Sequence, residues 1–386
     1  MNPLPSIPFG RPWITADERQ AVMDVLDSPI LTHGPQCKAF EEEFAAFVGE
    51  GAHCVSVSSC TAALHLAYFY FGLGAGDEVI VPAQTHTATA HAVELVGAKA
   101  VFVDCILETG NIDPAAIAAA ITERTKAISI VHFLGIACPM DEIIAIANRH
   151  NLKVIEDAAL AVGTYFDGKH AGLHGDVGAF SFYPVKHITT AEGGMFVTRH
   201  REIADAVRKL RGFGVDRTFS ERKVPGMYDV LTLGFNYRMS DVQAAIGRQQ
   251  IHKIPDILER RAANFRRLQS HLAAVPNTLT IDSQTPRSTN SFYCLTLILR
   301  GPISTSRDAV VEQLNARGIG TSIYYPQPVP RMTYYRKKYG YDTSRYPNAT
   351  TISDCSIALP VGPHISLDEM DYIGKTVQQV IQEMTP

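Results

Sequence analysis

Three groups of polar residues follow predicted strands, and each group is of a type that takes part in catalysis. In "VSVSSCTAALHLA" a strand ends at residues 58–60 and a helix begins at Thr61; free N–H groups at a helix start can hold a phosphate. The strand of "VIEDAALAVG" ends in two acids, Glu156 and Asp157. Lys186 follows the strand of "FSFYPVKHITTAEGGM" and precedes a glycine turn. A lysine with a desolvated amine has a lowered pKa and attacks carbonyl groups.

Each group also has a structural explanation. A serine or threonine before a helix is commonly a cap, paired acids commonly form an ion pair, and most lysines are solvated surface groups. One ligand, pyridoxal phosphate, would use all three groups, with its phosphate at Thr61, its pyridine nitrogen facing Asp157 and its aldehyde at Lys186. A carboxylate beside that nitrogen keeps it protonated, which makes the ring an electron sink.

The elements that must position these groups alternate between strands and helices. Strands are predicted at residues 53–59, 77–82, 99–104, 126–135, 152–159, 178–186 and 193–199. Helices are predicted at residues 15–28, 34–49, 61–74, 87–98, 113–121 and 140–150, with Thr15 and Asp113 as caps. Such alternation predicts a mostly parallel sheet covered by helices, whose strand carboxyl ends share one ligand-binding edge.

The regular alternation of predicted strands and helices ends towards the C-terminus. A long helical stretch at residues 236–275 leads to a strand at 291–299, a helix at 306–318 and a last helix at 367–384. We therefore predict a large domain over residues 1–250, including an N-terminal arm, and a smaller α+β domain over residues 251–386.

Composition excludes several classes of protein. The chain has 386 residues and a formal net charge of −4, which gives no electrostatic case for binding nucleic acid or an anionic membrane. No signal peptide, apolar span or metal-ligand pattern is seen. The seven cysteines are scattered without a CxxC pattern, so we expect free thiols and a cytoplasmic enzyme with no metal.

Several motifs, in order along nearly the whole chain, resemble those of the DegT-type (DegT/DnrJ/StrS) sugar aminotransferases. These motifs are "LTHGPQCKAFEEEFAAFVG", "SSCTAAL", "GDEVIVPAQTHTATAHAVELVGAKAVFVD", "VIEDAALAVGTYFDGKHAGLHGDVGAFSFYPVKHITTAEGGM", "LGFNYRMSDVQAAIG" and "YYPQPVP". The resemblance implies an α/β, fold type I pyridoxal phosphate enzyme. Its large domain would hold a mostly parallel sheet between helices, and a smaller α+β domain would follow.

The same resemblance implies roles for single residues. Lys186 would form the Schiff base and shuttle a proton, and Asp157 would pair with the pyridine nitrogen. The residues implied for cofactor binding are Cys60, Thr61, His86, Asp157, Ser181, Lys186 and Asn236. Of these, Cys60, Thr61 and Ser181 would hold the phosphate. Asn236 would reach the phosphate in the neighbouring subunit, which implies an obligate homodimer.

His86 stands where the family places an aromatic ring over the cofactor, although a loop histidine with a backbone hydrogen bond is an equal reading. Glu192, Arg238 and Tyr325 would lie near the substrate; for the first two a structural ion pair remains an alternative. Two residues depart from the family pattern. Cys60 stands where glycine is common, and Leu160 stands where glutamine or histidine would bind the ring oxygen of the cofactor.

The resemblance implies transfer of an amine from L-glutamate to a ketone of a nucleotide-linked sugar. We expect C4 of a keto-deoxysugar, for a surface glycan such as lipopolysaccharide O-antigen or for a secondary metabolite; a C3 sugar ketone or a cyclitol ketone stays open. Sugar dehydratases of this type carry histidine at the lysine position, so Lys186 argues against that reaction. A regulator that keeps the cofactor, and a cysteine desulfurase-like enzyme, are weaker alternatives.

Overall fold

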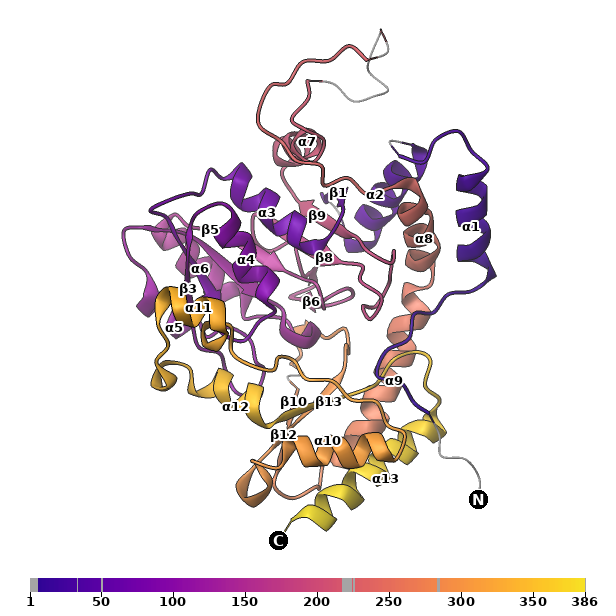
Figure 1. Cartoon of the computed structure of the whole chain (residues 1–386), viewed down its shortest axis with the longest axis vertical. Coiled ribbons are helices and arrows are strands. Elements are labelled where there is room, and N and C mark those ends of the chain that lie inside the picture. The colour runs from indigo at the N-terminus through magenta and orange to yellow at the C-terminus, as the bar shows by residue number, and fades with distance from the viewer. Residues whose placement is uncertain are drawn as a thin grey trace.

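The computed structural model describes residues 6–32, 34–49, 51–216, 224, 226–282 and 285–385. A seven-stranded sheet flanked by helices forms the larger part of the molecule, and a three-stranded sheet with its own helices forms a smaller part below it (Figure 1). The predicted α/β class with a mainly parallel sheet is therefore confirmed. The boundary between the two domains stays a prediction.

The large sheet has the strand order β1-β9-β8-β5-β4-β2-β3. Its strands are β1 (His53–Val57), β2 (Glu78–Pro82), β3 (Lys99–Val103), β4 (Thr125–Val131), β5 (Lys153–Asp157), β8 (Val177–Ser181) and β9 (Gly194–Thr198). The pairs β2–β3, β2–β4, β4–β5 and β5–β8 are parallel, whereas β9 runs antiparallel to both of its neighbours. The inner strands are almost entirely buried because helices cover both faces of the sheet.

The helices of the larger part are α1 (Ala16–Leu26), α2 (Pro35–Val48), α3 (Cys60–Tyr70), α4 (Thr87–Leu95), α5 (Pro114–Ala120), α6 (Met140–His150), α7 (Arg201–Leu210) and α8 (Asp241–His252). Both predicted caps are confirmed. Thr15 forms a capping box with Glu18, and the Asp113 side chain accepts the N–H of Ala115 at 2.9 Å. Every helix within the described residues is too short or too polar to cross a membrane.

Two predicted boundaries were wrong. The strand predicted at residues 178–186 ends at Ser181, so Lys186 lies in a turn beyond it. The helical stretch predicted at residues 236–275 is two helices, α8 and α9 (Ile254–Leu272), separated at Lys253. Pro255 in the first turn of α9 explains that break, because proline cannot continue the hydrogen bonds of a preceding helix.

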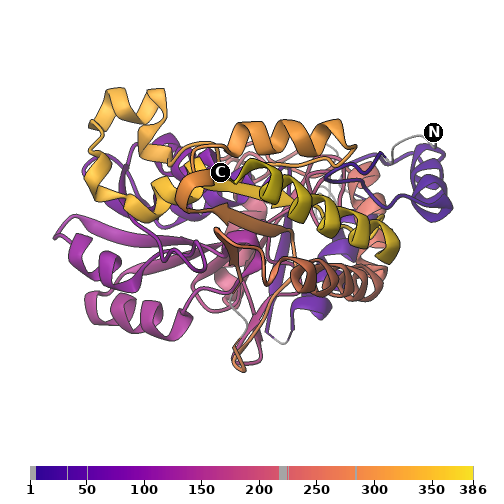
Figure 2. The same ribbon diagram turned by 90° about the horizontal axis from the view of Figure 1, so that it is seen from below.

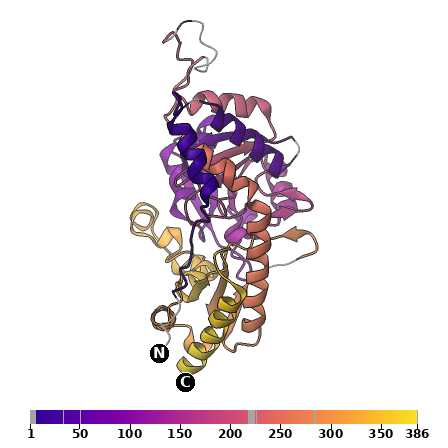
Figure 3. The ribbon, with the colours of Figure 1, turned by 90° about the vertical axis from the view of Figure 1, so that its right-hand side faces the viewer.

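The smaller part contains the sheet β10-β12-β13, made of β10 (Thr278–Ile281), β12 (Leu295–Leu299) and β13 (Ser356–Leu359). Its helices are α10 (Arg307–Ala316), α11 (Thr333–Tyr339), α12 (Pro347–Cys355) and α13 (Leu367–Met384). Seen from below, α13 lies between α9 and α10 (Figure 2). From the side, α9 runs from the level of the large sheet to α13 (Figure 3).

Two contacts tie the parts together. Ile7 pairs with Ile319 and packs in the apolar core of the smaller part, so the N-terminal arm crosses to it. The short strand β11 (Ser288–Thr289) pairs with β6 (Tyr165–Phe166), which in turn pairs with β7 (Lys169–His170). Hydrogen bonds hold the segments around residues 290 and 324 beside the large sheet: the Ser291 N–H donates to the Gly135 carbonyl at 3.2 Å, and Gln84 Nε2 donates to the Tyr324 carbonyl at 2.8 Å.

Candidate active site

A cavity of about 280 Å³ lies at the carboxyl edge of the parallel strands. Its walls come from the start of α3, the residues before α4, the end of β5, the turn after β8 and the segment before α11. The predicted site residues that line it are Cys60, Thr61, His86, Asp157, Ser181, Lys186, Glu192 and Tyr325. Leu160, the predicted departure from the family pattern, lines it too.

Asp157 ends β5, and its carboxylate is held by three donors. The Thr89 hydroxyl donates to Oδ2 at 2.7 Å, and the Ala159 N–H donates to Oδ1 at 3.1 Å. The Cys60 thiol lies 3.9 Å from Oδ1. The hydroxyl oxygens of Thr85 and Thr89 are 2.8 Å apart, and because the Thr89 hydroxyl donates its hydrogen bond to Asp157, the Thr85 hydroxyl is the donor to Thr89. These contacts fix the direction of the Asp157 carboxylate.

The start of α3 faces the cavity beside two hydroxyl groups. Ser59 caps the helix by accepting the Ala62 N–H at 3.1 Å, and Thr61 follows in the first turn. Gly194 of β9 lies against this turn, where a Cβ atom would be 2.6 Å from the Cys60 nitrogen. Only glycine permits that approach. Thr61 of this turn and Ser181 at the end of β8 both line the cavity.

Lys186 reaches the cavity from the turn after β8. Its backbone N–H donates to the Tyr183 carbonyl at 2.9 Å, which closes the turn. Burial lowers the pKa of the Lys186 amine, although the charge of Asp157 acts in the opposite direction. The Nζ atom lies 5.5 Å from the centre of the Tyr293 ring. Lys186 therefore has the desolvated amine that a lysine needs to attack a carbonyl group, and it lies at the carboxyl edge of the sheet.

His86 is the residue that caps α4, and its Nδ1 accepts the Ala88 N–H at 3.1 Å. The backbone hydrogen bond considered as an alternative is therefore present. The ring also lines the cavity and meets the Tyr325 ring edge-on at 5.6 Å. Because Nδ1 accepts, Nε2 carries the proton of the neutral ring, and burial lowers the pKa of His86.

Asn236 and Arg238 do not line this cavity. Asn236 is exposed and pairs through its backbone with Gly212, while the Arg238 guanidinium lies 4.9 Å from the Phe213 ring. Within one protomer the structure does not bring these two residues to the others. The side chain of Glu192 does face the cavity, and its carbonyl accepts from Gln243 at 2.6 Å.

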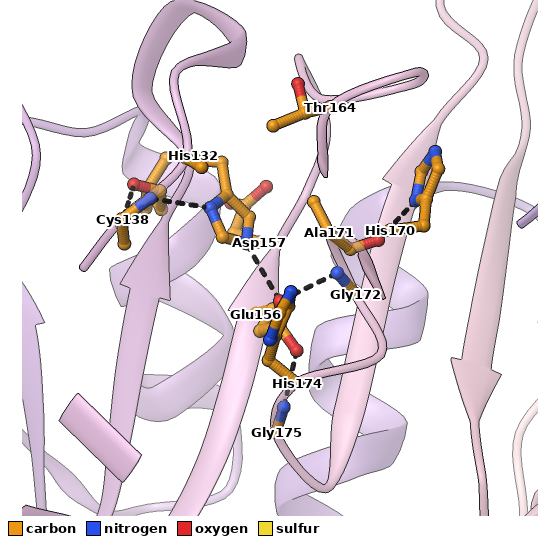
Figure 4. Close-up of polar contacts among 12 residues, drawn as sticks. His132, Cys138, Glu156, Asp157, Thr164, His170, Ala171, Gly172, His174 and Gly175 are labelled. Carbon is orange, nitrogen blue, oxygen red and sulfur yellow. Dashed lines mark hydrogen bonds and ion pairs between the residues drawn. The ribbon is translucent and has the colours of Figure 1, made fainter. Parts of the chain in front are cut away.

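Glu156 takes no part in the cavity. Successive strand residues point to opposite faces, so Glu156 points away from the side of Asp157. Its carboxylate accepts from His132 Nε2 at 2.8 Å and from the backbone N–H groups of Gly172 and Gly175 at 2.7 and 2.6 Å (Figure 4). Of the two acids in "VIEDAALAVG", one is therefore a structural anchor and the other a site residue.

Sequence reasoning missed Thr85, Thr89 and Tyr293. Thr89 lies in the first turn of α4, and the sequence "TATAHA" does not distinguish a threonine that contacts the site from one that caps the helix. Tyr293 lies in an apolar run before β12, which is typical of a core position. All three meet the site only through tertiary contacts.

The residues present fit pyridoxal phosphate. A primary amine, a carboxyl group and a helix start with hydroxyl groups are the partners that an aldehyde, a pyridine nitrogen and a phosphate need. The cavity volume lies near the lower end of small-ligand pockets, which begin at about 300 Å³.

Comparison with known proteins decides the family. A model of the DegT/DnrJ/EryC1/StrS aminotransferase family matches residues 12–378. The chain belongs to this family. That membership confirms the resemblance drawn from the sequence, the enzyme class and the pyridoxal phosphate cofactor.

Similar family proteins cover almost all of the chain. The spore coat polysaccharide biosynthesis protein SpsC of Bacillus subtilis is 37% identical over 380 residues, which is 97% of each chain. Spr1654 of Streptococcus pneumoniae in its PMP form has a TM-score of 0.92 at 30% identity, covering 98% of this chain and 100% of its own. PseC of Helicobacter pylori, an aminotransferase involved in pseudoaminic acid biosynthesis, has a TM-score of 0.92 at 25% identity, with coverage of 98% and 100%.

Proposed function

We propose that this enzyme transfers the amine of L-glutamate to a keto group, at C4, of a nucleotide-linked deoxysugar. The observation that carries the proposal is an amine and a carboxylate, Lys186 and Asp157, that face one cavity in a chain of the sugar aminotransferase family. When bound, pyridoxal phosphate supplies the electron sink that lets an amine leave one carbon and join another.

Asp157 is the proposed partner of the pyridine nitrogen. Hydrogen bonds from Thr89 and Ala159 support this role because they fix the direction of the Asp157 side chain. Lys186 is the proposed attachment point, and it holds and releases at Nζ the proton that the transfer moves. Its lowered pKa supports this role, since a larger share of the amine is then unprotonated at neutral pH.

Thr61 and Ser181 are the proposed side-chain donors to the phosphate. We expect Thr61→Val and Ser181→Ala each to weaken cofactor binding about 10- to 100-fold, because a hydrogen bond to a charged group contributes about 1.5–3 kcal/mol. Titration of the cofactor-free protein with pyridoxal phosphate, followed by fluorescence, measures this. Ser270→Ala, which removes an exposed hydroxyl of α9, is the control. Unchanged affinity in both site variants would contradict the assignment.

On the substrate side we propose Glu192 and Tyr325, which face the cavity, with His86 beside them. The functions of SpsC and PseC support a sugar substrate destined for a surface glycan. A C3 sugar ketone and a cyclitol ketone need the same residues and remain alternatives. A cytoplasmic location agrees with the seven free thiols, six of them buried and Cys355 half-buried.

The test of the proposal has two steps. In the first step, the purified protein should be yellow and should lose this colour when L-glutamate is added, because the amine passes to the cofactor. In the second step, the protein that now carries the amine should transfer it to one member of a panel of keto-sugar nucleotides. Product mass and NMR identify the carbon that receives the amine. A colour that never responds to glutamate would contradict the proposal and would favour a regulator.

A homodimer with shared active sites is part of the proposal. Asn236 and Arg238 lie outside the cavity of their own protomer, so they are available to a partner's site. Exposed apolar side chains gather on the segment that projects beyond α7 (Figure 1), namely Met227, Val230, Leu231 and Leu233. A second, apolar hollow of about 690 Å³ lies between α1 and the turn after β8. Exposed apolar surface of this kind marks protein interfaces.

Charging the projecting segment should therefore separate the protomers. We expect the double change Leu231→Asp and Leu233→Asp to halve the molar mass measured by light scattering and to lower activity with it. Each side chain is more than 60% exposed in the single protomer, so replacing it should not destabilise the fold of that protomer. Leu367→Asp, at a similarly exposed leucine on α13, is the control and should stay dimeric. An unchanged mass in the double variant would locate the interface elsewhere.

A further inference from the structure

We propose that Tyr293 is a positioning residue for Lys186, whose free amine rests against the face of the tyrosine ring. The inference rests on the proposed role of Lys186 in the reaction. The Nζ atom lies 5.5 Å from the ring centre, within the distance of about 6 Å at which a cation is attracted by the face of an aromatic ring. Tyr293 is only 3% exposed, so water does not screen this attraction.

Tyr293 is held by hydrogen bonds at its ring hydroxyl and at its backbone carbonyl. Its hydroxyl oxygen lies 2.7 Å from that of Tyr324, and its backbone carbonyl accepts from Arg261 Nη1 at 2.8 Å. The carbonyl of Tyr324 is held in turn by Gln84 Nε2 at 2.8 Å. Tyr293 therefore cannot swing away when the amine leaves, and the face that it presents to Lys186 is the same before and after each turnover.

The charges around the ring explain why a ring, rather than an acid, fits here. The Arg261 guanidinium is buried 5.8 Å from the ring centre. Burial and Arg261 both lower the pKa of His187, and they outweigh the hydrogen bond to the Ser291 carbonyl, 2.9 Å from Nε2, which raises it, so His187 is neutral. Lys186 thus shares the ring with one permanent cation. The Tyr293 ring is therefore a contact that both buried cations share.

The titratable groups that interact with the Lys186 amine are the histidines His86 and His187, together with Asp157, Cys60 and Cys294. Burial raises the pKa of both thiols, so these stay neutral and Asp157 is the one anion among them. A second carboxylate at the place of Tyr293 would hold the amine protonated. An aromatic face attracts the ammonium more weakly and accepts no proton from it, so it retains the amine without competing for its chemistry.

The test measures the acidity of the Lys186 amine in the full-length protein without cofactor. Competitive labelling with acetic anhydride across a pH series, with mass spectrometry of the peptide that contains Lys186, gives the midpoint of its titration. We expect Tyr293→Met to lower that midpoint by about 0.4–1.5 pH units, which corresponds to the 0.5–2 kcal/mol of a buried cation–ring contact. Tyr293→Phe keeps the ring and should leave the midpoint unchanged.

A graded series keeps the proposal testable if the methionine variant fails to fold. Position 293 is replaced by phenylalanine and then by phenylalanine with one, two and three ring fluorines. These side chains keep the shape of the ring, while each added fluorine weakens the attraction of the ring face for a cation. The midpoint should fall in the same steps. Tyr324→Phe, which removes only the hydroxyl partner, is the matched control and should leave the midpoint unchanged. A midpoint that stays constant through the series, or that shifts as much in Tyr293→Phe as in Tyr293→Met, would overturn the proposal.

These readouts are independent of the transamination proposal. They use neither cofactor nor sugar, so a constant midpoint leaves the reaction intact. Conversely, borohydride reduction that traps the cofactor on a residue other than Lys186 would remove the proposed reaction without moving the labelling midpoint.

Discussion

Lys186→Ala is expected to lower turnover by at least about 100- to 10,000-fold, the range for loss of a general acid–base group. Lys186 is the one lysine among the described residues that line the cavity with Asp157. No other lining residue supplies a primary amine that could take over its role. The variant should also lose the yellow colour of the attached cofactor. Stopped-flow measurement of bleaching by glutamate separates this loss from a defect in sugar binding.

The same change should not lower the melting temperature of the cofactor-free protein. Burial lowers the pKa of the Lys186 amine, so protonation of this group opposes folding below its ordinary pKa of about 10.4. Removing the amine removes that penalty. Lys209→Ala, which removes an exposed lysine of α7, is the activity control. Full activity in Lys186→Ala would show that the site is assigned to the wrong residue.

Glu156→Gln is expected to destabilise the protein by at least about 1–3 kcal/mol, the cost of leaving one buried donor without its acceptor. The three donors to Glu156 cannot adapt. Two are backbone N–H groups, from Gly172 and Gly175. The third is His132 Nε2, whose proton is fixed there because Nδ1 accepts the Cys138 N–H at 3.1 Å. A glutamine would direct its own N–H groups at one of them.

The effect of this change should depend on pH. Burial alone raises the pKa of Glu156, but the hydrogen bond from His132 and the backbone N–H groups outweigh it, so the pKa lies below its ordinary value. A lowered acid pKa adds stability that is present above about pH 4.3 and is lost as the pH falls through the folded-state value. Urea unfolding at pH 7 and pH 4 measures this. The difference between wild type and variant should shrink at the lower pH.

Glu123→Gln is the matched control for Glu156→Gln, because Glu123 is exposed in the turn before β4, and its stability should match the wild type at both pH values. Equal stabilities of Glu156→Gln and the wild type at pH 7 would contradict the anchoring role. The result also bears on the site, because His132 donates its backbone N–H to the Asp157 carbonyl at 3.1 Å. Loosening the anchor would therefore disturb the strand end that presents Asp157.

Local chemistry was sufficient to predict much of the fold and part of the site. The strand and helix alternation, the Thr15 and Asp113 caps and the position of Asp157 at a strand end all depend on neighbouring residues, whose types are read directly. The strand before Lys186 was predicted too long, since "FYPVK" reads as apolar as the strand itself. Whether its backbone pairs with a neighbour depends on where β9 lies beside it, and the last pair of that ladder is Ser181 with Gly194.

The amino-acid sequence by itself determined the family, the α/β class and the lysine and carboxylate of the candidate site. The family follows from motifs in order along the chain that resemble those of known members, whereas the α/β class and the candidate lysine and carboxylate follow from periodicity, capping and strand ends, which act locally. Only the tertiary structure decided which of two adjacent acids faces the cavity, and that Thr89 and Tyr293 reach Asp157 and Lys186. The reason is physical: contacts between residues 68 and 107 positions apart depend on how the layers pack, and a hydroxyl or a ring looks the same in sequence whatever it will meet.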